Sequence, residues 1–287
     1  MAPGEMQVWL NHFEYHAQHP HHVPEYACEA LRPAERRLIA CSIATFQLAE
    51  RTRSAGLARA AGQFSRAHGM PMLERIMALL VVEEQRHALM LRTYMQAHRI
   101  PPRGCGWADR IAGQVRRLAG FEAHLNMLIS AELIGIVYYR ALESATRCRR
   151  LKVLCRVLVA DELAHVGFES QLLLGWRDRR SPGMRALVRA VHRTFFALHA
   201  GLTWLRHRAV LRRGGYDLVG FARACLAQYA FYLEPPLRAS RMESSRSCSL
   251  SSSPLSLRAS SLISISARRL TSKSSSPRSR SRVFWRF

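Results

Sequence analysis

The sequence predicts an all-α protein built around a four-helix bundle, with additional helices toward the C-terminus. Hydrophobic residues make up 48% of the 287 positions, which is ample material for a core. Aromatic residues and glycines are modest in number, and no run of residues shows the alternation of a strand bounded by turns. Long stretches instead repeat apolar residues at helical spacing, with prolines and glycines near their ends.

The N-terminal third is predicted to hold a lead-in and three helices. Residues 1–33 are expected to be irregular and rich in histidine. Pro33 then opens a long helix over residues 34–53, because proline suits the first turn of a helix. A segment of small residues predicts a short helix that ends at Gly69. The next long helix is predicted from Pro71 to His98.

Four further helices are predicted in the rest of the chain. The third long helix is expected over residues 107–146, with a bend near Gly120, and the fourth over residues 148–179. A fifth helix follows over residues 183–213, and a shorter one ends near Leu233. The predicted organisation is therefore a lead-in over 1–33, the bundle over 34–180, accessory helices packed on it over 181–235, and a tail over 236–287.

The tail and the net charge first point to a nucleic-acid partner. The formal charge is +23, and residues 236–287 are rich in serine and arginine. However, only two of the 43 basic residues are lysines, so coding bias explains the arginine excess. The tail cannot bury enough apolar surface to offset its ordering entropy, and we expect it to be disordered. Nucleic acid is therefore not the expected partner.

The cysteines and the N-terminus indicate a cytoplasmic protein. The seven cysteines are odd in number and form no CxxC pair, which argues against a disulfide framework and a cysteine-based zinc site. The N-terminal residues lack the basic head and apolar core of a secretory signal. The most apolar stretch, residues 125–139, is short and contains Glu132, so a membrane span is not expected and any membrane contact would be peripheral.

Two Glu-x-x-His motifs carry the chemistry. They are Glu84 to His87 and Glu162 to His165. A three-residue step places both side chains on one helix face, one turn apart, where they can chelate one metal ion. Chance supplies such motifs in a chain of this composition, so their location matters more than their number. Each lies on a helix stripe that is otherwise almost entirely apolar, where an unpaired acid is expensive to bury.

A lone glutamate on another apolar helix precedes each motif. Glu50 comes 34 residues before Glu84, and Glu132 comes 30 residues before Glu162, which suggests an internal duplication. Four carboxylates would also neutralise two divalent ions. Buried salt bridges are the alternative interpretation, but the stripes carry no arginine close to the acids except Arg53. The predicted metal ligands are Glu50, Glu84, His87, Glu132, Glu162 and His165.

These motifs resemble those of the ferritin-like superfamily of di-iron carboxylate proteins. EEQRH at 83–87 and DELAH at 161–165 resemble segments of acyl carrier protein desaturases and rubrerythrins, although the chain has no rubredoxin-like CxxC module. The run from Trp9 to Gln171 is similar to a bacterial group of ferritin-like domain proteins. The resemblance implies two iron ions and a reaction with O2 or peroxide that needs a small-molecule substrate and an electron donor. The donor types themselves, four carboxylates and two imidazoles, suit iron or manganese, and zinc is also possible.

Other polar residues are predicted to support the centre. Asp161 is expected to accept the free N–H of a ligand histidine, and Glu83 has the corresponding position; the alternative is that both are surface acids. Gln47 and Tyr139 either face the metals or are ordinary core polar residues. Glu169 is a candidate seventh ligand or proton carrier. The N-terminal histidines are a possible site of adventitious metal binding, but the HPHHVP stretch is expected to be a solvated loop.

Three functions remain open from the sequence. The first is an oxidoreductase that activates O2 or peroxide, in which residues 183–233 cap a substrate pocket. The second is an iron-oxidising protein without an organic substrate, which would require a closed shell of subunits to store iron. The third is a peripheral membrane hydroxylase, similar to the di-iron quinone hydroxylases. The pattern is also compatible with a homodimer.

Overall fold

The computed structural model describes residues 1–23, 30–53, 56–106, 113–114 and 120–234, and these residues form helices and connecting segments without a strand. The all-α prediction is therefore confirmed for the described part of the chain. The predicted tail over 236–287 lies outside the described residues, as does most of the region 107–119, where the third long helix was expected to begin.

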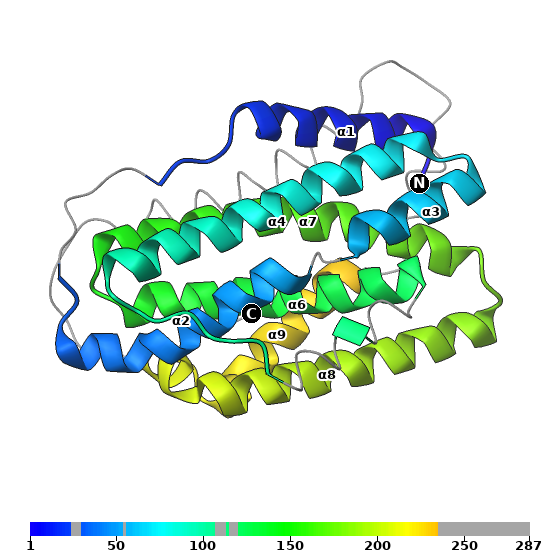
Figure 1. Ribbon diagram of the computed structural model, residues 1–287. Coiled ribbons are helices and arrows are strands. Elements are labelled where there is room, and N and C mark those ends of the chain that lie inside the picture. Colours follow the sequence, from blue (N-terminus) through cyan, green and yellow to red (C-terminus); the bar gives the residue numbers. More distant parts are fainter. Residues whose placement is uncertain (24–29, 54–55, 107–112, 115–119, 235–287) are drawn as a thin grey trace, which may run out of the picture. The chain divides into compact units, whose positions relative to one another are not determined.

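Four long helices supply the residues of the predicted centre (Figure 1). They are α2 (Pro33–Arg53), α4 (Pro71–Ala97), α6 (Phe121–Ala145) and α7 (Arg149–Asp178). Helix α4 packs against both α2 and α7, and α6 packs against α7. Their bounds agree with the prediction within about two residues, except that the described part of α6 begins only after Gly120.

The remaining helices surround these four. They are α1 (Pro3–Gln18), α3 (Leu57–His68), α8 (Pro182–Arg213) and α9 (Leu218–Leu233). Helices α1 and α3 pack on α4, whereas α8 and α9 pack on α6 and α7. The prediction that residues 1–33 are irregular is wrong for α1. Most residues of this helix are polar, so its short apolar side was not recognised in the sequence. Met6 and Phe13 lie on that side and are buried.

The helix ends follow local chemistry. Ser181 accepts a hydrogen bond from the Met184 amide, and Asp217 accepts one from the Gly220 amide, so each caps a helix N-terminus. Pro182 occupies the first turn of α8, where its missing N–H leaves no helical bond unmade. Gly69 ends α3 with a φ of 64°, the left-handed conformation that glycine adopts without strain.

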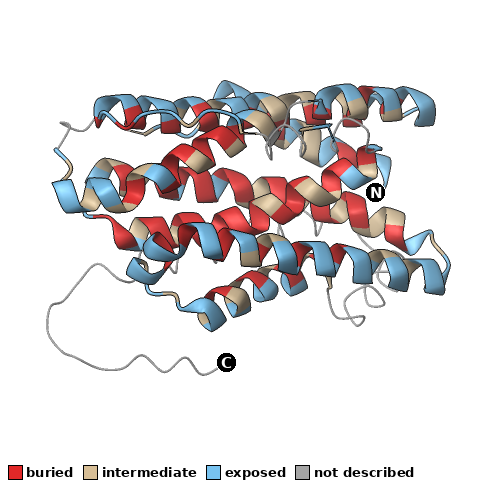
Figure 2. Cartoon of the chain, turned by 60° about the horizontal axis from the view of Figure 1, so that its bottom comes forward, coloured by how far each residue is buried: buried red, intermediate tan, exposed pale blue. Residues whose placement is uncertain are grey.

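The buried residues gather where the helices face one another (Figure 2). Helix α6 is the most apolar of the long helices. It meets the length and composition of a membrane span, with a mean hydropathy of 1.3, but 78% of that apolar window is buried against the rest of the protein. Its contacts on several sides, with α7, α8, α9 and α3, are those of a central core helix.

A close approach between α8 and α6 depends on a glycine. A Cβ atom added to Gly214 would lie 2.3 Å from the carbonyl oxygen of Ala141. We expect Gly214→Ala to lower the free energy of unfolding by about 1–3 kcal/mol, because the end of α8 must move away from α6.

Gly201→Ala is the matched control on the same helix, since its Cβ meets no atom within 4 Å. That change should raise stability by roughly 0.5–1 kcal/mol, and chemical denaturation measures both; equal effects would contradict the packing argument.

A buried histidine on α8 makes stability depend on pH. Burial and the nearby Arg206 and Arg103 lower the pKa of His207 to about 4, and its Nδ1 lies 2.8 Å from the Ser42 hydroxyl. Because the folded-state pKa is below the usual 6.5, this contribution to stability is complete above pH 6.5 and is lost as the pH falls toward 4. The loss should reach about 3 kcal/mol.

The variant His207→Asn isolates this contribution. It keeps a polar group near Ser42 but cannot gain a proton, so its unfolding free energy should fall less between pH 6.5 and pH 4 than that of the unaltered protein. The pKa of His192 is also lowered to about 4, so the difference between the two proteins is the quantity to measure. Parallel pH profiles would contradict the assignment.

Candidate metal centre

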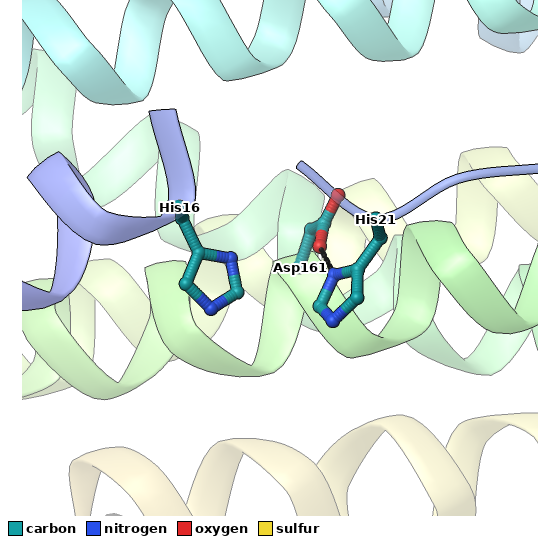
Figure 3. A group of neighbouring side chains, drawn as sticks. All are labelled: His16, His21 and Asp161. Carbon is teal, nitrogen blue, oxygen red and sulfur yellow. Dashed lines mark hydrogen bonds and ion pairs between the residues drawn. The ribbon is translucent and has the colours of Figure 1, made fainter. Parts of the chain in front are cut away.

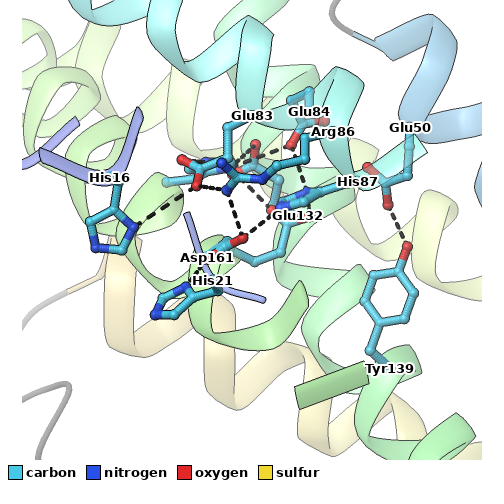
Figure 4. Close-up of polar contacts among 12 residues, drawn as sticks. His16, His21, Glu50, Glu83, Glu84, Arg86, His87, Glu132, Tyr139 and Asp161 are labelled. Carbon is cyan, nitrogen blue, oxygen red and sulfur yellow. Dashed lines mark hydrogen bonds and ion pairs between the residues drawn. The ribbon is translucent and has the colours of Figure 1, made fainter. Parts of the chain in front are cut away.

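Four helices bring the six predicted ligand residues together in the interior (Figure 4). The residues form two groups of four, each with donor atoms within 4.8 Å of one another. One group is Glu50, Glu84, His87 and Glu162, and the other is Glu84, Glu132, Glu162 and His165. Glu84 and Glu162 thus belong to both groups, and each group has one further glutamate and one histidine.

The imidazoles point their Nδ1 atoms at the shared carboxylates. His165 Nδ1 lies 3.3 Å from a Glu84 oxygen and 3.4 Å from a Glu162 oxygen. His87 Nδ1 lies 3.7 Å from Glu84 and 3.8 Å from Glu162. The i, i+3 spacing produces this convergence, because α4 and α7 each turn their Glu and His toward the other helix.

Several donor atoms of the cluster have no hydrogen-bond partner in the described part of the chain. The carboxylate oxygens of Glu132 and Glu162 and the Nδ1 atoms of His87 and His165 meet at ion-pair distances but make no hydrogen bond of good geometry. All four side chains are fully buried. Buried carboxylates without donors are costly, and cations at these positions would supply the missing interactions. The donor set therefore fits divalent metal ions.

A second layer of acids holds the other side of each imidazole. Asp161 on α7 lies 3.0 Å from His87 Nε2 on α4, and Glu83 on α4 lies 3.1 Å from His165 Nε2 on α7. The contacts that the sequence predicted for these acids are present, and they cross between the two helices. Both acids are buried, so the alternative that they are surface acids is wrong.

The electrostatics of the second layer keep these acids ionised. Burial alone would raise the pKa of Asp161, but its bonds to His21 and His87 hold that pKa well below the ordinary value. Burial acts in the same way on Glu83, whose pKa is nevertheless lowered to about 2 by the neighbouring His165. An ionised carboxylate at Nε2 requires that the imidazole carry a proton there, which leaves Nδ1 directed at the centre.

The crowding of negative charge shifts the pKa values of the predicted ligand residues themselves. Burial alone would lower the pKa of His87, but Asp161 and Glu84 raise it to about 10. The pKa of His165 is raised well above its usual value in spite of burial, because Glu162, Glu83 and Glu84 surround it. Burial and the adjacent Glu169 raise the pKa of Glu132. The cluster of predicted ligands thus holds more carboxylates than cationic side chains, and bound cations would balance this excess.

Arg86 is a cation that the sequence analysis did not connect with the centre. Its guanidinium donates to Glu83 and lies 3.2 Å from Asp161, so it joins the two second-layer acids. Arginine therefore accounts for the second layer, whereas the ion pairs that Glu132 and Glu162 make within the described residues are with histidine. The side chain of Arg53, the arginine expected nearest the acids, lies outside the described residues.

The other predicted site residues have different surroundings. The Tyr139 hydroxyl donates to Glu50, so this residue faces the cluster. Gln47 instead donates to the Ala88 carbonyl at 3.4 Å, as expected of a core polar residue. Glu169 is fully buried beside Glu132 but belongs to neither group of four. Its suggested role as ligand or proton carrier stays a prediction.

Helix α1 covers the centre, which the sequence analysis missed. The ring of Phe13 stacks on His165 with centroids 5.9 Å apart. His16 Nδ1 is 4.0 Å from Glu83. His19, His21 and His22 are exposed in a non-helical segment, as expected of a solvated loop, and His21 in addition bonds to Asp161. The signal was the i, i+4 spacing of His12 and His16, which places both on the side of α1 that faces the acids.

A cavity of about 610 Å³ lies between α2, α6 and α8. Its lining is mainly apolar, with Arg103 and Arg206 among the polar residues. Ala49 and Ala131, which line it, immediately precede two of the ligand glutamates in sequence. The cavity therefore lies against the two helices that supply Glu50 and Glu132.

Comparison of the chain with protein-family models, with curated proteins and with solved structures gave no match.

Proposed function

We propose that the chain is a ferritin-like di-iron carboxylate protein with a four-helix bundle at its core, and that it is an oxidoreductase acting on O2 or peroxide. The observation that carries this proposal is the pair of four-residue groups that share Glu84 and Glu162. Four glutamates match the charge of two divalent cations. The family resemblance of the two Glu-x-x-His motifs supports iron, and the donor set also fits manganese.

The proposal assigns a role to each ligand. Glu84 and Glu162 would each contact both ions, because they belong to both groups. Glu50 and His87 would complete one site, and Glu132 and His165 the other. When bound, the two iron ions would supply the electrons that reduce O2 or peroxide.

The surrounding residues prepare the site for cations. Asp161 and Glu83 fix the imidazole tautomers through Nε2, so that Nδ1 can lose its proton when a metal binds. Tyr139 holds one oxygen of Glu50 and thereby orients the carboxylate. The apolar residues around the cluster keep water away from the reacting groups.

The cavity between α2, α6 and α8 supports an organic substrate. Its apolar lining fits an apolar small molecule, and α8 belongs to the region that was expected to cap a substrate pocket. Iron handling without an organic substrate is the alternative. Light scattering tests it, because a monomer or dimer cannot enclose an iron core.

Elemental analysis and absorption spectroscopy test the proposal directly. The purified protein should contain about two iron ions per chain. Exposure of the anaerobically reduced, Fe(II)-loaded protein to O2 should change its near-ultraviolet and visible absorption and consume O2. The zinc-loaded protein is the control and should show neither change. A protein that takes up no iron, or whose iron does not react with O2 or peroxide, would refute the proposal.

A specific feature of α8 favours a second candidate, the peripheral membrane hydroxylase. Seven large apolar side chains on one face of α8 are exposed: Met184, Leu187, Val191, Phe195, Leu198, Leu202 and Leu205. Exposed arginines flank this face toward the end of the helix, and α8 contains no acid. An apolar face between cations suits an anionic lipid surface, whereas a homodimer through it would bring arginines together.

Sedimentation with anionic liposomes tests the membrane candidate. The unaltered protein should pellet with the vesicles, and Leu198→Glu/Leu202→Glu should remain in solution because two charges would enter the bilayer interface. Failure of the unaltered protein to pellet would leave the first candidate standing.

A further inference from the structure

A second cluster of potential ligands lies outside the centre (Figure 3). It consists of His16 near the end of α1, His21 in the segment that follows, and Asp161 on α7. One ring nitrogen of each histidine and one carboxylate oxygen of Asp161 lie within 4.8 Å of one another. Two imidazoles and a carboxylate form a donor set that binds Fe(II) and similar divalent ions.

This cluster is accessible from solvent, unlike the centre. The side chain of His21 is 43% exposed and that of His16 is 17% exposed, whereas Asp161 is fully buried. The histidine rings lie 5.0 Å apart between their centroids. A metal ion could therefore reach the histidines from outside and meet a carboxylate that is already fixed by other bonds.

Each outer histidine is connected to an inner one through a single carboxylate. His21 contacts one oxygen of Asp161, and the other oxygen of Asp161 lies 3.0 Å from His87. His16 lies 4.0 Å from one oxygen of Glu83, and the other oxygen lies 3.1 Å from His165. The second-layer acids thus separate the outer cluster from the centre by one side chain.

We propose that His16, His21 and Asp161 form a third metal site. A divalent ion binds there first and then passes to the two-metal centre while the centre is being filled. The proposal rests on the proposed function, since it gives the outer ion a destination. On binding, the metal takes the place of the hydrogen bond between His21 and Asp161, whose proton is released to solvent. The guanidinium of Arg86 bonds to Asp161 at 3.2 Å and opposes tight binding, which suits transfer better than permanent retention.

Cobalt(II) is the probe for this site. The full-length protein, without a histidine tag and freed of metal, is titrated with Co(II) under equilibrium dialysis, and bound metal is determined by elemental analysis. We expect about three ions per chain, two from the centre and one weaker. The variant His16→Ala/His21→Ala should lose only the weak ion. Stopped-flow mixing should show the centre filling at least about tenfold more slowly in this variant.

The controls separate the outer site from general histidine binding and from folding. His19→Ala/His22→Ala removes two exposed neighbours in the same segment and should behave as the unaltered protein. His21→Gln changes one exposed side chain only and should still weaken the third ion. Asp161 stays unaltered in these variants, because it also holds His87.

The outcomes distinguish this proposal from the proposed function. Three ions and unchanged loading rates in His16→Ala/His21→Ala and in His21→Gln would overturn the outer site, as would an unaltered protein that binds only two ions. A protein that binds one ion, which is lost in His16→Ala/His21→Ala, would support the outer site and refute the two-metal centre.

Discussion

Replacing Glu162 with alanine is expected to lower the bound metal from about two ions per chain to less than one. Glu162 belongs to both four-residue groups, so its loss removes a ligand from both sites at once. It is fully buried, and its ion pairs within the described residues are with His165 and His87, at 3.4 Å and 3.8 Å. Loss of a terminal ligand such as Glu132 should have a smaller effect, because only one group contains it.

Elemental analysis after desalting measures this effect. Asp178→Ala is the matched control on the same helix, because its side chain is 75% exposed and lies far from both groups in sequence. That variant should keep its metal. Two ions retained by Glu162→Ala would contradict the assignment of Glu162 as a shared ligand.

A second change at Glu162 should alter stability differently with and without metal. Glu162→Leu removes one of several buried carboxylates that lie close together, so the metal-free variant should have a higher free energy of unfolding, by about 1 kcal/mol, because repulsion between like charges is reduced. Metal addition should stabilise the unaltered protein but not this variant, because binding to the folded state alone raises stability. Thermal denaturation with and without a chelator measures both changes. Destabilisation of the metal-free variant would indicate that Glu162 has a structural role instead.

The second large effect is expected at Glu83. Glu83→Ala should weaken metal binding by about 10- to 100-fold, because His165 loses the acceptor that fixes its ring and tautomer. Glu83→Gln should lose less, since the amide oxygen can still accept the Nε2 hydrogen while the negative charge is gone. Competition with a chromophoric chelator measures the affinities.

A matched control exists on the same helix. Glu74→Ala removes an acid whose side chain is 44% exposed and pairs only with Arg66 at 3.0 Å among the ion pairs of the described residues. Its metal affinity should be unchanged. If Glu83→Ala and Glu74→Ala have equal affinities, the second layer does not act on the metals.

Much of the fold and the candidate ligand set could be predicted from the sequence. The apolar stripes define the helices, and the prolines and glycines at their ends define most bounds. The six ligand residues are visible because acids and imidazoles interrupt apolar stripes at i, i+3 spacing, and this periodicity is local. The structure brings these six residues together, whereas the binding of metal to them stays a prediction.

Local spacing does not specify which residues meet across helices. The crossing of Asp161 to His87 and of Glu83 to His165 depends on how α4 and α7 pack, as does the contact of Tyr139 with Glu50. Helix α1 was missed because it carries many polar residues. Its few buried side chains are recognised as a core-facing side only once α1 is seen to pack on α4.

The sequence by itself therefore determined the long helices and the six candidate ligand residues, because helix periodicity and burial cost act within one helix. Only the tertiary structure decided that two glutamates are shared between the groups, that α1 covers them, and that His16 and His21 lie outside Asp161. The reason is physical: these relations join side chains from different helices, and their distances are set by packing between helices, which no single helix pattern contains.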